Sequence, residues 1–181
     1  TMNLITQATV SAASAHDRKI RKGSGLPYIL HPMEAAAIVA TMTDDQILIA
    51  AALLHDILED TPITYDELAV RFGSQIADIV QIETEDKSKS WAERKGHTIE
   101  TLPGQPAHIK IVMLGDKLSN LRSTYNDYLR IGDRLWERFR MKDKNMQGWY
   151  YLGMLKGFQS IDHFPAYQEY LTLARRIFGE P

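Results

Sequence analysis

The chain has 181 residues, of which 44% are hydrophobic and 24% charged, and it contains no cysteine. This length allows one domain with a sizeable core over residues 1–181, and the lack of cysteine excludes disulfides, thiolate metal sites and cysteine nucleophiles. A net charge of −2 argues against a general nucleic-acid-binding protein. No stretch approaches the roughly 20 apolar residues of a membrane helix, and the N-terminus lacks a signal-peptide pattern. We therefore expect a cytoplasmic protein whose partner is neither a membrane nor a nucleic acid.

Helical periodicity dominates the chain, which predicts a compact all-α fold of many helices. The first amphipathic helix is predicted over residues 4–20 and is followed by a loop at 22–27, where glycine and proline break the helical pattern. A second helix begins near Pro32, since proline suits a first helical turn. A third runs from Asp44 to Asp60 and ends before a threonine–proline pair.

The second half of the chain also alternates between helical patterns and polar or proline-rich breaks. Thr64 and Glu67 form a capping box that opens a fourth helix, which ends near Gly73. A polar segment at 83–90 leads into a helix over 91–101, and prolines flanking a glycine then end it. Three further helices are predicted after this break: 107–125, 144–158 and 164–178.

The predicted helix over 44–60 combines an apolar body with ionisable side chains at its C-terminal end. Apolar residues surround the helix before its last turns, so it should be buried. Its end carries four ionisable groups: His55, Asp56, Glu59 and Asp60. Because a helix turns about 100° per residue, all four fall within an arc of roughly 140°. Buried charges need compensation, which a metal ion would supply. The alternatives are a hydrogen-bonded core histidine and solvated carboxylates at a helix end.

Two more polar side chains stand in constrained or apolar surroundings. His31 lies in a short segment between two prolines, just before a predicted helix. Asp116 lies in the middle of an apolar helix beside Gly115, which permits a close approach of other groups. A structural histidine and an Asp116–Lys117 ion pair are the alternatives. Together with His55 and Asp56 of the core helix, His31 and Asp116 would form a set of two imidazoles and two carboxylates that suits a first-row divalent ion.

The order His, His-Asp, Asp is the ligand order of the HD phosphohydrolases. Three segments closely resemble the hydrolase domain of the RelA/SpoT family: Pro27–Pro32, Ala51–Thr61 and Gly115–Arg122. The resemblance extends over about residues 8–160. That family removes pyrophosphate from the 3′ position of the alarmones ppGpp and pppGpp, so the resemblance implies hydrolysis of (p)ppGpp to GDP or GTP plus pyrophosphate. It also implies a compact, all-helical HD-domain fold.

The resemblance assigns roles to individual positions. It implies four ligands for one divalent ion, Mn²⁺ by preference, with Fe²⁺ and Zn²⁺ as alternatives: His31, His55, Asp56 and Asp116. Glu59 and Asp60 match the acidic pair that orients and activates the attacking water. Arg21, Lys22 and Asn120 match residues that contact the nucleotide. A small-molecule nucleotide is therefore the expected partner.

The chain departs from the family pattern at several points that concern the substrate pocket. Gly115 replaces a usual alanine, and Ser119 replaces a usual histidine or aromatic residue. Segments 83–102 and 126–148 match poorly. The length is that of a stand-alone alarmone hydrolase, without the synthetase domain of bifunctional members. The alternatives are the same fold acting on (p)ppApp or on the 2′-phosphate of NADPH and, less favoured because all six metal and acidic residues are present, a non-catalytic nucleotide-binding protein.

Overall fold

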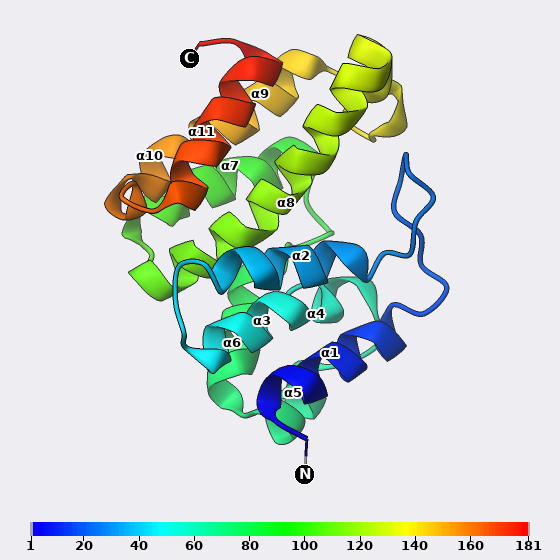
Figure 1. Cartoon of the computed structure of the whole chain (residues 1–181), viewed down its shortest axis with the longest axis vertical. Helices are drawn as coiled ribbons and strands as arrows, with labels where there is room; N and C mark the ends of the chain where they lie inside the picture. Colours follow the sequence, from blue (N-terminus) through cyan, green and yellow to red (C-terminus); the bar gives the residue numbers. More distant parts are fainter. Residues whose placement is uncertain (1, 181) are drawn as a thin grey trace.

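The computed structural model describes residues 2–180, and every regular element in this range is helical (Figure 1). The predicted all-α fold is confirmed. Extended pairing in the described range is limited to an isolated bridge between Ile20 and Pro27 at the base of a loop. None of the described helices combines the length and the apolarity that crossing a membrane requires.

The N-terminal half packs short helices around a buried apolar one. Its elements are α1 (Leu4–Ala15), α2 (Leu30–Val39), α3 (Gln46–Leu54), α4 (Ile57–Asp60), α5 (Tyr65–Phe72) and α6 (Ser74–Glu83). Asp45 caps α3 by accepting a hydrogen bond from the Ile47 amide at 2.9 Å. The predicted capping box of Thr64 and Glu67 opens α5.

The C-terminal half is built along one long helix. Its elements are α7 (Trp91–Thr101), η1 (Leu102–Gly104), α8 (Ala107–Ile131), η2 (Gly132–Arg138), α9 (Lys144–Gly153), α10 (Leu155–Phe158), η3 (Gln159–Ile161) and α11 (Pro165–Phe178). In Figure 1, α8 runs through the middle of the molecule, between α2 and α3 on one side and α11 on the other. Buried apolar side chains from α1 to α11 form one continuous core around it.

Small residues allow α2 and α8 to cross closely. A Cβ atom on Gly115 would lie 2.6 Å from Val39 Cγ2 and 2.8 Å from the Ala35 carbonyl oxygen. Side chains larger than hydrogen therefore do not fit at this crossing without moving a backbone. The crossing places the start of α2 beside the centre of α8, and so brings His31 next to Asp116.

The predicted continuous helix over 44–60 is wrong. The helix ends at Leu54, His55 and Asp56 form a turn, and α4 begins at Ile57. The His55 imidazole donates a hydrogen bond from Nδ1 to the Ala52 carbonyl at 2.7 Å. In a continuous helix this carbonyl would accept the backbone N–H of Asp56. The His55 side chain thus competes with the Asp56 backbone N–H for the Ala52 carbonyl, and the helix breaks at His55 and Asp56, two of the predicted metal ligands.

Other boundaries differ by two to six residues. The helix predicted at 4–20 ends at Ala15, α2 begins two residues before Pro32, and the helix predicted at 107–125 continues to Ile131. Residues 74–82, which received no assignment from the sequence, form α6 together with Glu83. The predicted helix 144–158 is divided at Met154 between α9 and α10.

Candidate metal centre and substrate cavity

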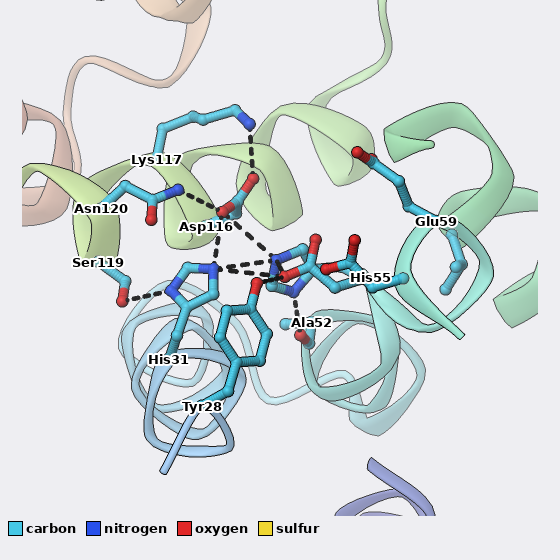
Figure 2. Close-up of polar contacts among 12 residues, drawn as sticks. Tyr28, His31, Ala52, His55, Glu59, Asp116, Lys117, Ser119 and Asn120 are labelled. Atoms are coloured by element: carbon cyan, nitrogen blue, oxygen red, sulfur yellow. Dashed lines mark hydrogen bonds and ion pairs between the residues drawn. The ribbon is translucent and has the colours of Figure 1, made fainter. Parts of the chain in front are cut away.

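Three predicted ligands meet at one buried point, each from a different helix or helix end. His31 lies in the first turn of α2, His55 directly follows α3, and Asp116 lies within α8. The two imidazole Nε2 atoms are 3.2 Å apart, and Asp116 Oδ1 lies 3.1 Å from that of His31 and 3.3 Å from that of His55 (Figure 2). All three side chains are buried. We call these three residues the ligand cluster.

Asp56, the fourth predicted ligand, lies at the edge of the ligand cluster. Its Oδ2 atom is 3.0 Å from His55 Nε2 and 3.7 Å from His31 Nε2. The Tyr28 hydroxyl donates a hydrogen bond to the same Oδ2 atom. Tyr28 received no role from the sequence, although it stands three residues before His31 in the motif that carries the resemblance.

The donor atoms of the ligand cluster fit a divalent cation. Because the Ala52 carbonyl accepts from His55 Nδ1, the Nε2 atom of this ring faces the cluster and is available as a ligand. Nitrogen and carboxylate oxygen donors without sulfur are typical of Mn²⁺, Fe²⁺ and Zn²⁺ sites. His31, His55 and Asp116 each offer one donor atom, and these atoms lie within 4.8 Å of one another.

Electrostatics favour positive charge inside the ligand cluster at neutral pH. Burial raises the pKa of Asp116, but the Lys117 ammonium and the two histidines outweigh it and hold that pKa well below its usual value. Burial lowers the pKa of His55, while Asp56 and Asp116 more than offset this and raise it well above the ordinary value. The same carboxylates that attract a proton to His55 would attract a metal ion.

Asp116 is held in place by two polar neighbours on α8. Lys117 Nζ lies 2.7 Å from Asp116 Oδ2, and Asn120 donates from Nδ2 to Asp116 Oδ1 at 2.9 Å (Figure 2). Arg21 in turn donates to Asn120 Oδ1 at 3.0 Å. The ion pair weighed above as an alternative to metal binding therefore coexists with the ligand cluster, because Lys117 uses the other carboxylate oxygen.

The acidic pair Glu59 and Asp60 lies on α4, beside the ligand cluster, and faces the loop that follows α6. Glu59 Oε2 accepts a hydrogen bond from the Glu85 backbone N–H at 3.3 Å. Burial raises the pKa of Glu59, and this backbone hydrogen bond only partly counteracts the effect. Asp60 forms ion pairs with Lys19 and, at 3.3 Å, with Lys87.

Two cavities flank the acidic pair. One, of about 460 Å³, is lined in part by Tyr28, Asp60 and Asn120, and the other, of about 360 Å³, reaches Glu59 and Asp60. Both are lined by Lys22 and Arg140. Further cations line one or the other: Lys19, Arg21, Lys87, Arg94, Lys95 and Arg138. The arrangement concentrates positive charge beside the ligand cluster in a protein whose net charge is −2.

The sequence assigned nucleotide contacts to Arg21, Lys22 and Asn120 in this region, but it assigned no role to three further cations of the cavities, Lys87, Arg138 and Arg140. Lys87, Arg138 and Arg140 lie in the loop after α6 and in the segment around η2, where the resemblance was poor. Their charge was visible in the sequence, but their position beside α4 depends on how these segments fold back.

Comparisons with known proteins agree with the fold and the motifs. The HD domain family matches residues 8–134. The proteins of Mus musculus and Homo sapiens named guanosine-3′,5′-bis(diphosphate) 3′-pyrophosphohydrolase MESH1 are each 38% identical to this chain over 143 residues, which cover 77% of either partner. The bifunctional (p)ppGpp synthase/hydrolase SpoT of Escherichia coli K12 is 35% identical over 126 residues, 66% of this chain and 18% of SpoT.

Solved structures show the same architecture. The crystal structure of a Listeria monocytogenes EGD-e protein is 32% identical, with a TM-score of 0.77 over 83% of this chain and 99% of that one. The structure of a metazoan ortholog of SpoT that hydrolyses ppGpp has a TM-score of 0.77 over 97% of this chain and 96% of its own; at 24% identity it supports the fold alone. The chain therefore belongs to the HD domain family and, within it, to the RelA/SpoT-type hydrolases.

Proposed function

We propose that this protein hydrolyses the 3′-pyrophosphate of ppGpp and pppGpp, releasing GDP or GTP and pyrophosphate. The observation that carries the proposal is the convergence of His31, His55 and Asp116 in a chain whose relatives MESH1 and SpoT are named for this activity. Membership of the HD domain family implies a divalent metal ion. We assign Mn²⁺ to the site as part of the proposal because the family resemblance favours this ion; the oxygen and nitrogen donors suit Mn²⁺, Fe²⁺ and Zn²⁺ alike.

Four residues would hold the ion: His31, His55 and Asp116 of the ligand cluster, with Asp56 at its edge. When bound, a divalent ion supplies Lewis-acid polarisation of the phosphoryl group and acidifies a water molecule. Tyr28 fixes the orientation of the Asp56 carboxylate through its hydrogen bond. Asn120 and Lys117 do the same for Asp116, so the donors are arranged before substrate binds.

Proton transfer falls to the acidic pair on α4. Glu59 is the better base of the two, because burial raises its pKa and strengthens its attraction for a proton. Its carboxylate accepts the proton of the attacking water. Asp60, paired with Lys19 and Lys87, orients the water and the cations around it.

The cations of the two cavities bind the phosphates of the substrate. Arg138 and Arg140 offer planar guanidinium groups that can bind phosphate oxygens in pairs, and Lys22 adds a point charge between the cavities. Phosphoryl transfer depends mainly on such positioning and charge neutralisation. The nucleotide, with its two pyrophosphate groups, matches this distribution of charge.

Product analysis tests the proposal directly. We expect incubation with ppGpp and Mn²⁺ to yield GDP and intact pyrophosphate, since attack at the phosphorus nearest the ribose releases both phosphates together. Stepwise appearance of single phosphate would contradict this regiochemistry. Parallel incubations with ppApp and NADPH compare the alternative substrates. His55→Ala serves as the matched control, because it removes one ligand and should abolish both metal binding and turnover.

A further inference from the structure

A hydrogen-bonded chain leads from His31 away from the ligand cluster. Ser119 Oγ, on α8, lies 2.8 Å from His31 Nδ1 and donates to Glu34 Oε1 at 2.7 Å. Glu34 stands one turn after His31 on α2. Arg122 Nη1 lies 3.5 Å from Glu34 Oε2, and the same guanidinium donates two hydrogen bonds to Glu169 of α11, at 2.6 and 2.8 Å. This series of hydrogen bonds therefore joins three helices, α2, α8 and α11, to the His31 imidazole.

The chemistry of its members sets the direction of every hydrogen bond. A carboxylate only accepts, so the Ser119 hydroxyl must give its single hydrogen to Glu34. Ser119 Oγ can then only accept from His31, which requires the proton of the neutral imidazole to be on Nδ1. The Nε2 atom is left without a proton, and it is this atom that faces the ligand cluster at 3.1 Å from Asp116 Oδ1.

We propose that Ser119 and Glu34 are positioning residues that hold His31 in the Nδ1-protonated tautomer and thereby set the affinity of the ligand cluster for its ion. The proposal rests on the proposed metal-dependent function. The other histidine does not need such a device, because His55 Nδ1 donates to a backbone carbonyl that accepts only. The tautomer of His31 depends on side chains alone, since a serine hydroxyl is both donor and acceptor and takes its direction from Glu34.

The surroundings of Ser119 and Glu34 explain why this series of hydrogen bonds is stable. Ser119 is fully buried between α2 and α8, so water does not compete for its hydroxyl. Glu34 is 40% exposed, and Arg122, fixed by Glu169, supplies the positive charge beside it. Without the Glu34 carboxylate, the Ser119 hydrogen is free to turn toward His31 Nδ1. His31 would then carry its proton on Nε2, and a protonated Nε2 atom cannot bind a metal ion.

Metal-affinity measurements on the full chain test this inference. Changes to groups that orient a metal-bound histidine typically cost about 10- to 100-fold in metal affinity. We expect this loss in Glu34→Ala and in Ser119→Ala, measured for Mn²⁺ and Zn²⁺ by competition with a chelator. Glu34→Gln should fall between wild type and Glu34→Ala, because a carboxamide oxygen still accepts from Ser119 while its N–H groups permit the reverse orientation. Ser11→Ala, at a buried serine of α1 whose hydroxyl has no hydrogen-bond partner within the described residues, should bind as wild type does.

A spectroscopic readout distinguishes positioning from a general structural role. Long-range ¹H–¹⁵N NMR of the metal-free full chain should show His31 protonated at Nδ1 in wild type and shifted toward Nε2 in Glu34→Ala. Wild-type affinity and an unchanged His31 tautomer in Glu34→Ala would overturn the inference. If His55→Ala loses the metal in the same experiments, such a result would overturn only the role of Glu34 and Ser119 and would leave the proposed metal-dependent function standing. Glu34 is partly exposed, so its variants decide the question even if Ser119→Ala fails to fold.

Discussion

At the residue scale, the two carboxylates of α4 have different environments despite being adjacent in sequence. Asp60 is paired closely with Lys19 and Lys87, whereas Glu59 accepts a hydrogen bond from the Glu85 backbone N–H and its Oε1 atom lies 3.9 Å from Lys87 Nζ. In Figure 2, Glu59 lies to one side of the ligand cluster, apart from the dashed contacts that join its members. This position suits a group that acts on a water molecule between itself and the cluster.

Replacing Glu59 by glutamine tests this role. Glu59→Gln keeps the shape of the side chain and removes its basic carboxylate, so turnover should fall by roughly 10²- to 10⁴-fold, the usual contribution of general base catalysis. Metal content and nucleotide binding should stay near wild type, as measured by metal analysis and titration. If Glu59→Gln and Asp60→Asn both retain wild-type turnover, the acidic pair is structural and the mechanism is wrong.

At the element scale, the crossing of α2 and α8 determines whether His31 meets Asp116. We expect Gly115→Ala to destabilise the protein by about 1–3 kcal/mol, since the added methyl group would overlap Val39 and the Ala35 backbone. It should also weaken metal binding by moving Asp116 away from α2. Denaturant unfolding and metal titration measure the two effects.

A second glycine provides the matched control for this prediction. Gly96 lies within α7, and a Cβ atom there would only touch Trp149 at 3.7 Å, an ordinary contact. Gly96→Ala should therefore stabilise the protein by up to about 1 kcal/mol through helix propensity. Equal effects of the two substitutions would show that the crossing tolerates a side chain.

The last residue of α6 links stability to pH. Burial raises the pKa of Glu83 from 4.5 to about 8, with Asp116 contributing and Lys117 opposing. Its Oε1 atom is buried without a hydrogen-bond partner among residues 2–180. The folded protein therefore keeps a proton on Glu83 that the unfolded chain has released, and this residue makes stability fall as pH rises from 4.5 to about 8.

Glu83→Gln should remove this dependence, because glutamine does not ionise. We expect the melting temperature of the variant to exceed that of wild type by a margin that grows as pH rises through this interval and then levels off. Thermal unfolding of both proteins after chelator treatment, at a series of pH values, measures the margin. A margin that does not change with pH would show that Glu83 ionises normally in the folded protein.

At the scale of the whole molecule, α8 connects all parts of one core. Its apolar side chains pack against α2 and α3 on one face and against α11 on another, and the core continues from Ala8 to Ile177. We therefore expect the proposed single domain to unfold in one cooperative transition, with equal calorimetric and van't Hoff enthalpies. Two resolved transitions in calorimetry would indicate separate folding units on either side of α8.

Much of the architecture follows from local sequence information. The 3.6-residue periodicity predicted an all-α fold, and the capping box at Thr64 located the start of α5, because both signals act within a few residues. Local patterns did not predict that α3 ends before His55, since the break depends on a side chain that takes the acceptor of a backbone hydrogen bond. They also left α6 unassigned, although its apolar residues follow the helical period.

The sequence by itself determined the residue types of the site and their order along the chain, His31, then His55 and Asp56, then Asp116. Tertiary structure decided which of them lie within reach of one another. The distances depend on the crossing of α2 and α8, where Gly115 allows the two helices to lie closer together than a larger side chain at this position would allow. The contact of Ser119 with His31 and Glu34, and the position of Arg140 beside the acidic pair, likewise join segments distant in sequence. Helical periodicity reports which face of each helix is buried, but only the packing of those faces determines which polar groups meet.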